Sequence, residues 1–253
     1  MIALAPRATA VGVRLVAHEV LGSTNAEALN LARQGERGPL WIVAERQTAG
    51  RGRRGRAWVS QPGNLFASLL LTMPAPPACG PQLSLVAALA VYDAVVEIAD
   101  GLKPRLTIKW PNDLLLDRAK FAGILVEGEG GDDGAAVVIG IGVDCTSHPA
   151  DTDYPATDLA AAGIVASPAT LMGPLSLKMI GRLAQWNGGA GFSTVRADWI
   201  ARAAGIGEEI RVQIADRELS GRFETLDATG ALVLRSPDGR TETITAADVF
   251  MPR

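Results

Sequence analysis

The stretch FAGILVEGEGGDDGAAVVIGIGV, residues 121–143, is the part of the sequence that best predicts the fold. Two runs rich in Val, Ile and Leu, 121–129 and 135–143, flank a short segment of Gly, Glu and Asp. Apolar runs joined by turn-forming residues are typical of neighbouring antiparallel strands. The stretch therefore predicts the centre of an antiparallel or mixed sheet.

Further strands and helices are expected on both sides of this stretch. The expected strands cover 11–20, 40–45, 64–73 and 105–110, and the expected helices cover 24–34, 82–99, 171–186 and 194–203. The first helix has an N-cap candidate in Ser23 or Thr24, and Thr24 stands three residues before Glu27, the spacing of a capping box. Adjacent strands with few helices between them predict an α+β fold with a mixed or largely antiparallel sheet.

The sequence pattern changes near residues 205–207. Short alternating runs follow, EIRVQI, ELSGRFETLD, ALVLRS and TETITAADVF, with turn residues between them. A segment this short that consists of such strands predicts a small β-barrel, which packs on the main domain because it is too small to be stable alone. We therefore expect a main domain over 1–206 and a C-terminal barrel over 207–253.

Composition argues against several classes of protein. Lys and Arg number 24 against 27 Asp and Glu, so no overall basic field can hold a nucleic acid. Two His and two Cys without zinc-ligand spacing argue against a zinc site and, more weakly, against a His-activated nucleophile. The distant cysteines favour free thiols, with a single disulfide as the alternative. Apolar runs too short or too charged to span a bilayer, and a start without a signal-peptide core, predict a cytoplasmic protein.

The run GRGRRGR, residues 50–56, is the most informative motif. It matches the dinucleotide pattern G-x-G-x-x-G, but that motif needs a helix directly after it, and AWVSQPGN predicts none. Guanidinium groups match phosphate and carboxylate oxygens, and glycines allow close approach and positive φ. We expect this arginine loop to bind a polyphosphate or acyl phosphate and to be mobile until an anion binds, because nothing nearby holds four like charges. A solvated loop and a nucleic-acid tract are the alternatives.

A second group of polar residues surrounds the predicted strand ends at 109–120. Lys109 ends one strand, a Trp-Pro-Asn-Asp turn follows, and Lys120 opens the next strand. This order would place two cations and the carboxylate of Asp113 at one rim of the sheet. Asp113 suits Mg²⁺ on a nucleotide, since hard cations take carboxylate oxygens, and a plain turn is the alternative.

Taken together, these motifs resemble the biotin protein ligase family. The matching pieces, in the family's order, are Ser23-Thr24-Asn25, Glu45 to Ala49 with the arginine loop and Trp58, Gly63-Asn64-Leu65, Lys109 to Asp113, Lys120 with Gly123 to Glu127, and Gly140 to Val143. The resemblance implies a catalytic α+β domain with an SH3-like barrel, in the form without the family's N-terminal DNA-binding domain. One departure is Asp144, where the family usually has asparagine.

The resemblance implies a two-step reaction. Biotin and Mg²⁺-ATP would give biotinyl-5′-AMP, and biotin would then pass to a lysine of a biotin carboxyl carrier protein or domain. Neither step needs a covalent enzyme intermediate, so positioning and charge stabilisation suffice. A homodimer is possible, and no nucleic-acid or membrane partner is expected. The alternatives are a lipoate ligase-like acyltransferase, a non-catalytic biotin-binding module and, least favoured, a nucleic-acid-binding protein.

The resemblance also implies roles for individual residues. The implied biotin-binding residues are Ser23, Thr24, Asn25, Gln47, Gly50, Arg51, Gly52, Arg53, Lys120 and Gly123. The implied nucleotide-binding residues are Arg53, Arg54, Arg56, Trp58, Lys109, Asn112, Asp113, Lys120 and Asp144. Lys120 and Arg53 would be catalytic, with Lys120 between the biotin carboxylate and the α-phosphate. Asp113 would hold Mg²⁺ together with ATP.

Overall fold

Seven strands form the main sheet of the computed structural model, which describes residues 2–73, 80–130, 135–214 and 217–251. These strands are β1 (Arg14–Leu21), β2 (Leu40–Gln47), β3 (Leu65–Met73), β4 (Leu106–Lys109), β5 (Asp113–Leu116), β6 (Ala119–Glu129) and β7 (Ala135–Val143). Their order is β1-β2-β3-β7-β6-β5-β4. The first pair is parallel and all other pairs are antiparallel, so the predicted mixed sheet is confirmed.

Two elements of the main domain were not predicted. The strand β5 follows the expected Trp-Pro-Asn-Asp turn, in a segment for which no element was predicted, and Leu114 to Leu116 pair with β4 on one side and β6 on the other. The helix α1 (Pro6–Ala10) falls in a segment that carries no periodic pattern. Both elements span only four or five residues, too few to show a helix or strand period.

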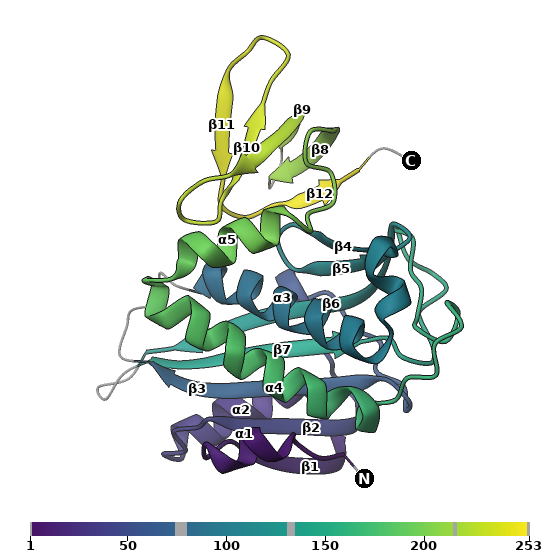
Figure 1. The fold of residues 1–253 in the computed structure, drawn as a ribbon, viewed down its shortest axis with the longest axis vertical. Helices are drawn as coiled ribbons and strands as arrows, with labels where there is room; N and C mark the ends of the chain where they lie inside the picture. Colours follow the sequence, from purple (N-terminus) through teal and green to yellow (C-terminus); the bar gives the residue numbers. More distant parts are fainter. Residues whose placement is uncertain (1, 74–79, 131–134, 215–216, 252–253) are drawn as a thin grey trace.

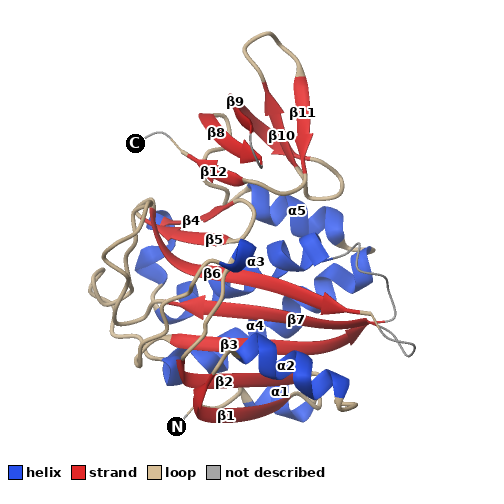
Figure 2. Cartoon of the chain, turned by 180° about the vertical axis from the view of Figure 1, so that it is seen from behind, coloured by secondary structure: helices blue, strands red, loops and turns tan. Residues whose placement is uncertain are grey.

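Helices cover the two faces of this sheet unequally. The helices α3 (Gly80–Ile98) and α4 (Pro168–Trp186) lie across one face, and α5 (Phe192–Ile200) follows them (Figure 1). On the opposite face α2 (Thr24–Arg33) packs on β2, β3 and β7, seen from behind in Figure 2. One face thus carries the main core, and the other is covered only in part.

Strand alternation decides which residues meet each face. On β7, Ile139 and Ile141 belong to the buried core under α3 and α4. Successive side chains of a strand point to opposite faces, so Gly140 and Gly142 lie on the face of α2. Consistent with this, a Cβ on Gly140 would meet the Asn25 side chain of α2 at 2.2 Å. The glycines of the GIGV motif therefore leave room on that face for the side chains of Asn25 and Trp58.

The helix α3 is the one helix among the described residues long and apolar enough to span a membrane by length and composition alone. Its window Pro81–Ile98 is 67% buried inside the protein. Its apolar side chains, from Leu83 to Val95, form the centre of the main core. Burial in the core therefore accounts for the mean hydropathy of 1.4 in this helix.

The C-terminal strands form a second sheet. They are β8 (Glu209–Ile214), β9 (Arg217–Leu226), β10 (Leu232–Arg235), β11 (Thr241–Ile244) and β12 (Asp248–Phe250), in the antiparallel order β11-β10-β9-β8-β12. The expected SH3-like domain of short antiparallel strands is confirmed, and its described strands form an open sheet rather than a closed barrel, with β11 and β12 at its two edges. These edge strands are short, with four and three residues. The division at 206/207 stays a prediction.

The second sheet packs directly on the main domain (Figure 1). Its buried side chains, such as Phe223 and Ile210, belong to the same hydrophobic cluster as the core of α3 and α4. Trp110 Nε1 donates to the Gly230 carbonyl at 3.1 Å, and Arg196 Nε donates to the Leu226 carbonyl at 2.8 Å. The two parts therefore share one core.

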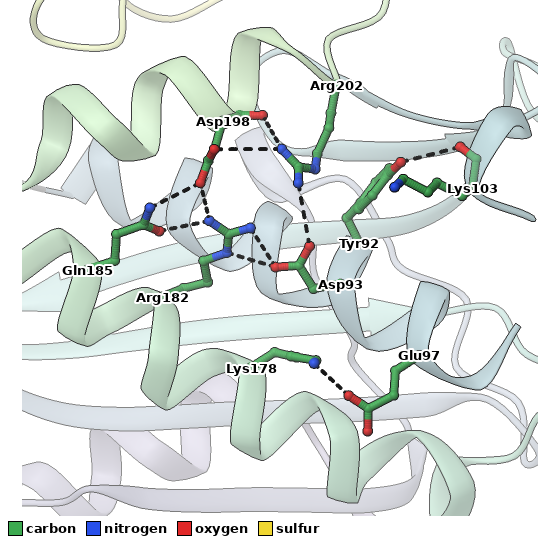
Figure 3. Close-up of polar contacts among 9 residues, drawn as sticks. All are labelled: Tyr92, Asp93, Glu97, Lys103, Lys178, Arg182, Gln185, Asp198 and Arg202. Carbon is green, nitrogen blue, oxygen red and sulfur yellow. Dashed lines mark hydrogen bonds and ion pairs between the residues drawn. The ribbon is translucent and has the colours of Figure 1, made fainter. Parts of the chain in front are cut away.

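A charged cluster joins α3, α4 and α5 (Figure 3). Arg182 of α4 pairs with Asp93 of α3 at 2.6 Å and with Asp198 of α5 at 2.5 Å. Its side chain is only 13% exposed. One guanidinium thus links three helices in a partly buried position.

We expect Arg182→Met to lower the free energy of unfolding by about 2–3 kcal/mol, because it leaves Asp93 and Asp198 with Arg202 alone, whose nitrogens lie 4.0 Å from each carboxylate. The matched control is Lys178→Met, which removes a nearby pair with Glu97 whose side chains are 33% and 43% exposed. Exposed pairs contribute about 0–1 kcal/mol. Urea denaturation of both variants tests this, and equal losses would show that the cluster is no stronger than a surface pair.

Candidate active site

A cavity of about 370 Å³ lies beside the open part of the sheet face on which α2 packs. Its volume is in the range of small-molecule sites. Its walls come from the start of α2, the arginine loop, the β4–β5 turn, β6, β7, residues 151–154 and β12. The predicted site residues that line it are Ser23, Thr24, Asn25, Gln47, Arg51, Gly52, Arg53, Arg56, Trp58, Lys109, Asn112, Asp113, Lys120 and Gly123. The structure thus brings together residues up to 100 positions apart.

Three predicted site residues do not line the cavity. Gly50 serves packing, since a Cβ there would lie 2.6 Å from Ser60 Oγ and 2.7 Å from the Trp58 carbonyl oxygen. Arg54 points to the C-terminal sheet instead. Asp144 is buried at 5% exposure, where Asn64 Nδ2 donates to its Oδ1 at 3.1 Å.

The start of α2 forms one polar end of the cavity. Ser23 is the N-cap, and its hydroxyl accepts from the Ala26 backbone; Thr24 is not the cap, and its side chain faces Gln47. Gln47 Oε1 accepts from the Thr24 backbone N–H at 2.8 Å and from the Thr24 hydroxyl at 3.1 Å. The Ser68 hydroxyl donates to Asn25 Oδ1 at 2.6 Å and so fixes the orientation of the Asn25 side-chain amide. Hydroxyls and amides held in this way suit a polar, uncharged ligand group.

The indole of Trp58 lies on a floor of glycines. A Cβ on Gly142 would lie 2.6 Å from the ring, and one on Gly123 would lie 2.9 Å from it. Gly142 and Gly123 are directly paired across β7 and β6, so the flat patch is built by strand register. Trp58 Nε1 is buried and has no hydrogen-bond partner among the described residues.

Lys120 occupies the centre of the site. Its Nζ lies 2.7 Å from Asp113 Oδ1, and it sits 5.3 Å from the Trp58 ring centre and 5.2 Å from that of Tyr154. Burial lowers the pKa of the adjacent Lys109 ammonium, while Asp113 opposes that shift. The predicted juxtaposition of two lysines and one aspartate at the sheet rim is confirmed. Such a pair of cations can hold two anionic groups close together.

The arginine loop is a small hairpin over the cavity. Arg51 and Ala57 form an isolated antiparallel β-bridge, and the turn between them has positive φ at Arg54 and Gly55. Arg53, Arg54 and Arg56 all contact the Asp248 carboxylate of β12. The expectation that nothing nearby holds these charges is therefore wrong, whereas the change in mobility on ligand binding stays a prediction.

Sequence reasoning missed two parts of the site. Residues 151–154 line the cavity, and the residues that follow them are held to Lys120, whose N–H donates to the Pro155 carbonyl at 2.8 Å and whose carbonyl accepts from the Thr157 N–H at 2.9 Å. The second part is Asp248 to Phe250, from the C-terminal sheet. Neither segment carries a motif, so no local signal could have identified them.

Asp144 has an unusual carboxyl group. Burial raises its pKa to about 8, with Asp158 adding to the effect and Lys120 opposing it. The ordinary value, 3.8, applies to the unfolded chain. Between these two values the folded protein keeps a proton that the unfolded chain has lost, so stability falls as pH rises through this window.

We expect Asp144→Asn to remove this pH dependence, because an amide does not ionise. From about pH 6 to about pH 9, the natural protein should lose at least about 1 kcal/mol more unfolding free energy than the variant. Urea denaturation at the two pH values measures this difference. Parallel losses in the two proteins would mean that Asp144 is already ionised near neutrality.

No group of three or more His, Cys, Asp or Glu side chains with metal-binding geometry occurs among residues the structure describes. Asp113, the predicted Mg²⁺ ligand, is paired with Lys120. Asp151 and Asp153 also line the cavity. Because Mg²⁺ commonly binds through one or two carboxylates and substrate phosphates, these residues fit an ion that enters with a nucleotide better than a resident one.

Comparison with protein families gives two matches along this chain. The model of the biotin/lipoate A/B protein ligase family matches residues 18–144. The model of the biotin protein ligase C-terminal domain matches residues 205–251. The first match contains most of the cavity residues, and the second contains Asp248 and its sheet.

Individual relatives agree with these matches. The chain is 42% identical to a biotin–acetyl-CoA-carboxylase ligase of Paracoccus denitrificans, over 90% of this chain and 96% of that protein. It is 35% identical to a bifunctional ligase/repressor of Bacillus subtilis, over 94% of this chain and 74% of that protein. The structure of an Aquifex aeolicus biotin protein ligase in complex with biotin and ATP has a TM-score of 0.79 and 25% identity, and the match covers 94% of this chain and 99% of that one.

Proposed function

This chain belongs to the biotin/lipoate A/B protein ligase family, and from that premise we infer that it is a biotin protein ligase. It activates biotin with ATP and transfers the biotinyl group to a lysine of a carrier protein. The observation that supports this best is the cavity in which neutral hydrogen-bonding groups at one end adjoin Lys120 and the arginines at the other. The C-terminal domain match and the 42% identical relative favour biotin over lipoate.

The neutral end of the cavity suits the biotin ring. Thr24 offers a hydroxyl group and Gln47 an amide group, and hydrogen bonds between the two residues fix their positions. Ser23 and Asn25 lie beside them at the start of α2. A ureido group needs both donors and acceptors, and these side chains provide both. The glycines at Gly123 and Gly142 let the Trp58 indole lie close against the sheet, so that this ring forms an apolar wall of the cavity for a bicyclic ligand. Arg51 and Gly52 would close the pocket from the loop side.

The charged end suits the triphosphate. Lys120 would lie between the biotin carboxylate and the α-phosphorus, where its ammonium offsets the repulsion between two anions. The carboxylate oxygen then forms a bond to phosphorus as pyrophosphate leaves. Arg53 and Arg56, which line the cavity, would hold the phosphates and retain the adenylate. Lys109 and Asn112 serve the nucleotide or the incoming lysine.

Several further features belong to this proposal. Mg²⁺ would arrive with ATP and be held beside Asp113, where it supplies charge neutralisation of the phosphates. The acceptor would be a lysine of a biotin carboxyl carrier protein or domain. A cytoplasmic location is also proposed, because the one helix of membrane-spanning length and composition among the described residues is mostly buried in the core.

The test is incubation of the protein with biotin, Mg²⁺-ATP and a biotin carboxyl carrier domain, followed by mass spectrometry of the carrier. The expected product carries one biotinyl group on one lysine, and omission of ATP abolishes it. A parallel reaction with lipoate and a lipoyl domain tests the alternative. Labelling by lipoate but not by biotin would reverse the assignment, and biotin binding without any transfer would indicate a non-catalytic module.

A further inference from the structure

The carboxylate of Asp248 is shared by three arginines of the loop. Arg53 Nη2 and Arg56 Nη2 lie 2.9 Å and 2.8 Å from its Oδ1, and Arg54 Nη1 lies 3.0 Å from its Oδ2. Arg53 Nη2 also donates to the Ala247 carbonyl at 2.9 Å. The loop and the C-terminal sheet, almost 200 residues apart in sequence, thus meet at one side chain.

These contacts stabilise a charge arrangement that the loop could not keep alone. Three guanidinium groups within reach of one carboxylate repel each other, and the loop that carries them contains three glycines. Burial alone would raise the pKa of Asp248, but the arginines outweigh it and lower that pKa. The side chain of Asp248 is 19% exposed, so solvent screens the contacts only in part.

The geometry allows the arginines to hold Asp248 and an anion together. A guanidinium has five N–H donors, and each contact with Asp248 uses one terminal nitrogen. Arg53 and Arg56 line the cavity together with Asp248, whereas Arg54 contacts the carboxylate from outside the cavity. A phosphate that enters can therefore accept from the remaining donors without displacing Asp248.

We propose that Asp248 is a positioning residue for ATP: it gathers the loop arginines at the mouth of the cavity before the nucleotide binds. The C-terminal sheet thereby takes part in the first half-reaction. This inference rests on the nucleotide-binding role proposed above for the arginines. The rival explanation is that the Asp248 carboxylate only occupies the position that a phosphate takes. In that case removal of the carboxylate would strengthen ATP binding rather than weaken it.

The test is the KM for ATP in biotin-dependent pyrophosphate exchange. Asp248→Asn should raise this KM about tenfold while kcat changes less than about threefold, because the arginines must then be ordered at the expense of ATP binding. Asp248→Glu keeps the charge and should recover most of the affinity. The matched control is Asp238→Asn, which removes an exposed carboxylate of the same sheet that pairs with Arg240. An unchanged or lowered KM in Asp248→Asn overturns the proposal.

Two further measurements distinguish a failure of the Asp248 proposal from a failure of the nucleotide-binding role of the arginines. Without ligand, proteolysis of residues 50–58 should be faster in Asp248→Asn than in the natural protein, and equal rates would count against the proposal. Arg56→Gln should itself raise the KM for ATP, and no change there would refute the nucleotide role of the arginines rather than the role of Asp248. If Asp248→Asn does not fold, Arg54→Gln replaces it, with a rise of about two- to threefold expected and no rise contradicting the proposal.

Discussion

Replacement of Lys120 by methionine is expected to slow biotin-dependent pyrophosphate exchange about 10²–10³-fold, because one electrostatic contact made in the transition state is worth roughly two to four kcal/mol. The two reacting groups, a carboxylate and a phosphate, must come within about 3–3.5 Å of each other. In a site where Lys120 is only 17% exposed, water cannot replace the ammonium between them. Methionine keeps the length of the stem, so the change isolates the charge.

The position of Lys120 strengthens this expectation. Its Nζ lies against Asp113 and two aromatic rings, so its removal also leaves the Asp113 carboxylate facing the incoming anions. Lys103→Met, at an exposed lysine outside the cavity, is the control for a general loss of positive charge. Thermal melting establishes that both variants fold. Exchange by Lys120→Met within a few-fold of the natural rate would place the decisive cation elsewhere, with Arg53 the next candidate.

The second large effect is expected for Gly142→Ala. A Cβ at this position would lie 2.6–2.7 Å from three atoms of the Trp58 indole, so the ring must move into the cavity. Overpacking of this kind costs about 1–3 kcal/mol, and we expect kcat/KM for biotin to fall about 10- to 100-fold. The measurement is biotin-dependent exchange at saturating ATP.

A neighbouring glycine provides the control for Gly142→Ala. Gly128 also lies in the strand pair β6–β7, but a Cβ there would meet only the Ala136 carbonyl oxygen at 3.5 Å, an ordinary contact. Gly128→Ala should leave kcat/KM unchanged within about twofold. If both alanine variants keep full activity, the glycine floor does not shape the ligand site.

The central sheet and the charged rim could be predicted because their signals are local. Two runs rich in Val, Ile and Leu within 121–143 indicate strands whatever they pack against, and the strand ends near Lys109 and Lys120 place these lysines at one rim of the sheet. The arginine loop was predicted from its composition and its place after β2. Each of these inferences depends on residues within about a dozen positions of one another.

The remaining features depend on contacts between distant segments. Nothing near Asp248 indicates that its carboxylate meets arginines of residues 53–56, because only the packing of the second sheet on the main domain brings them together. Strand spacing predicted a small β-barrel, but whether its first and last strands pair depends on contacts that spacing does not determine, and the described strands form an open sheet. Gly50 was assigned to the ligand from its motif, whereas the structure uses it for packing against Ser60.

The most direct test of this account is a crystal structure of the protein after incubation with biotin and Mg²⁺-ATP. We expect biotinyl-5′-AMP in the cavity, with the biotin ring at Thr24 and Gln47 and the phosphate within hydrogen-bond distance of Lys120 Nζ. Arg56 should contact the phosphate while Asp248 still holds the loop. An adenylate bound outside the cavity, or one whose phosphate makes no contact with Lys120, would contradict the account.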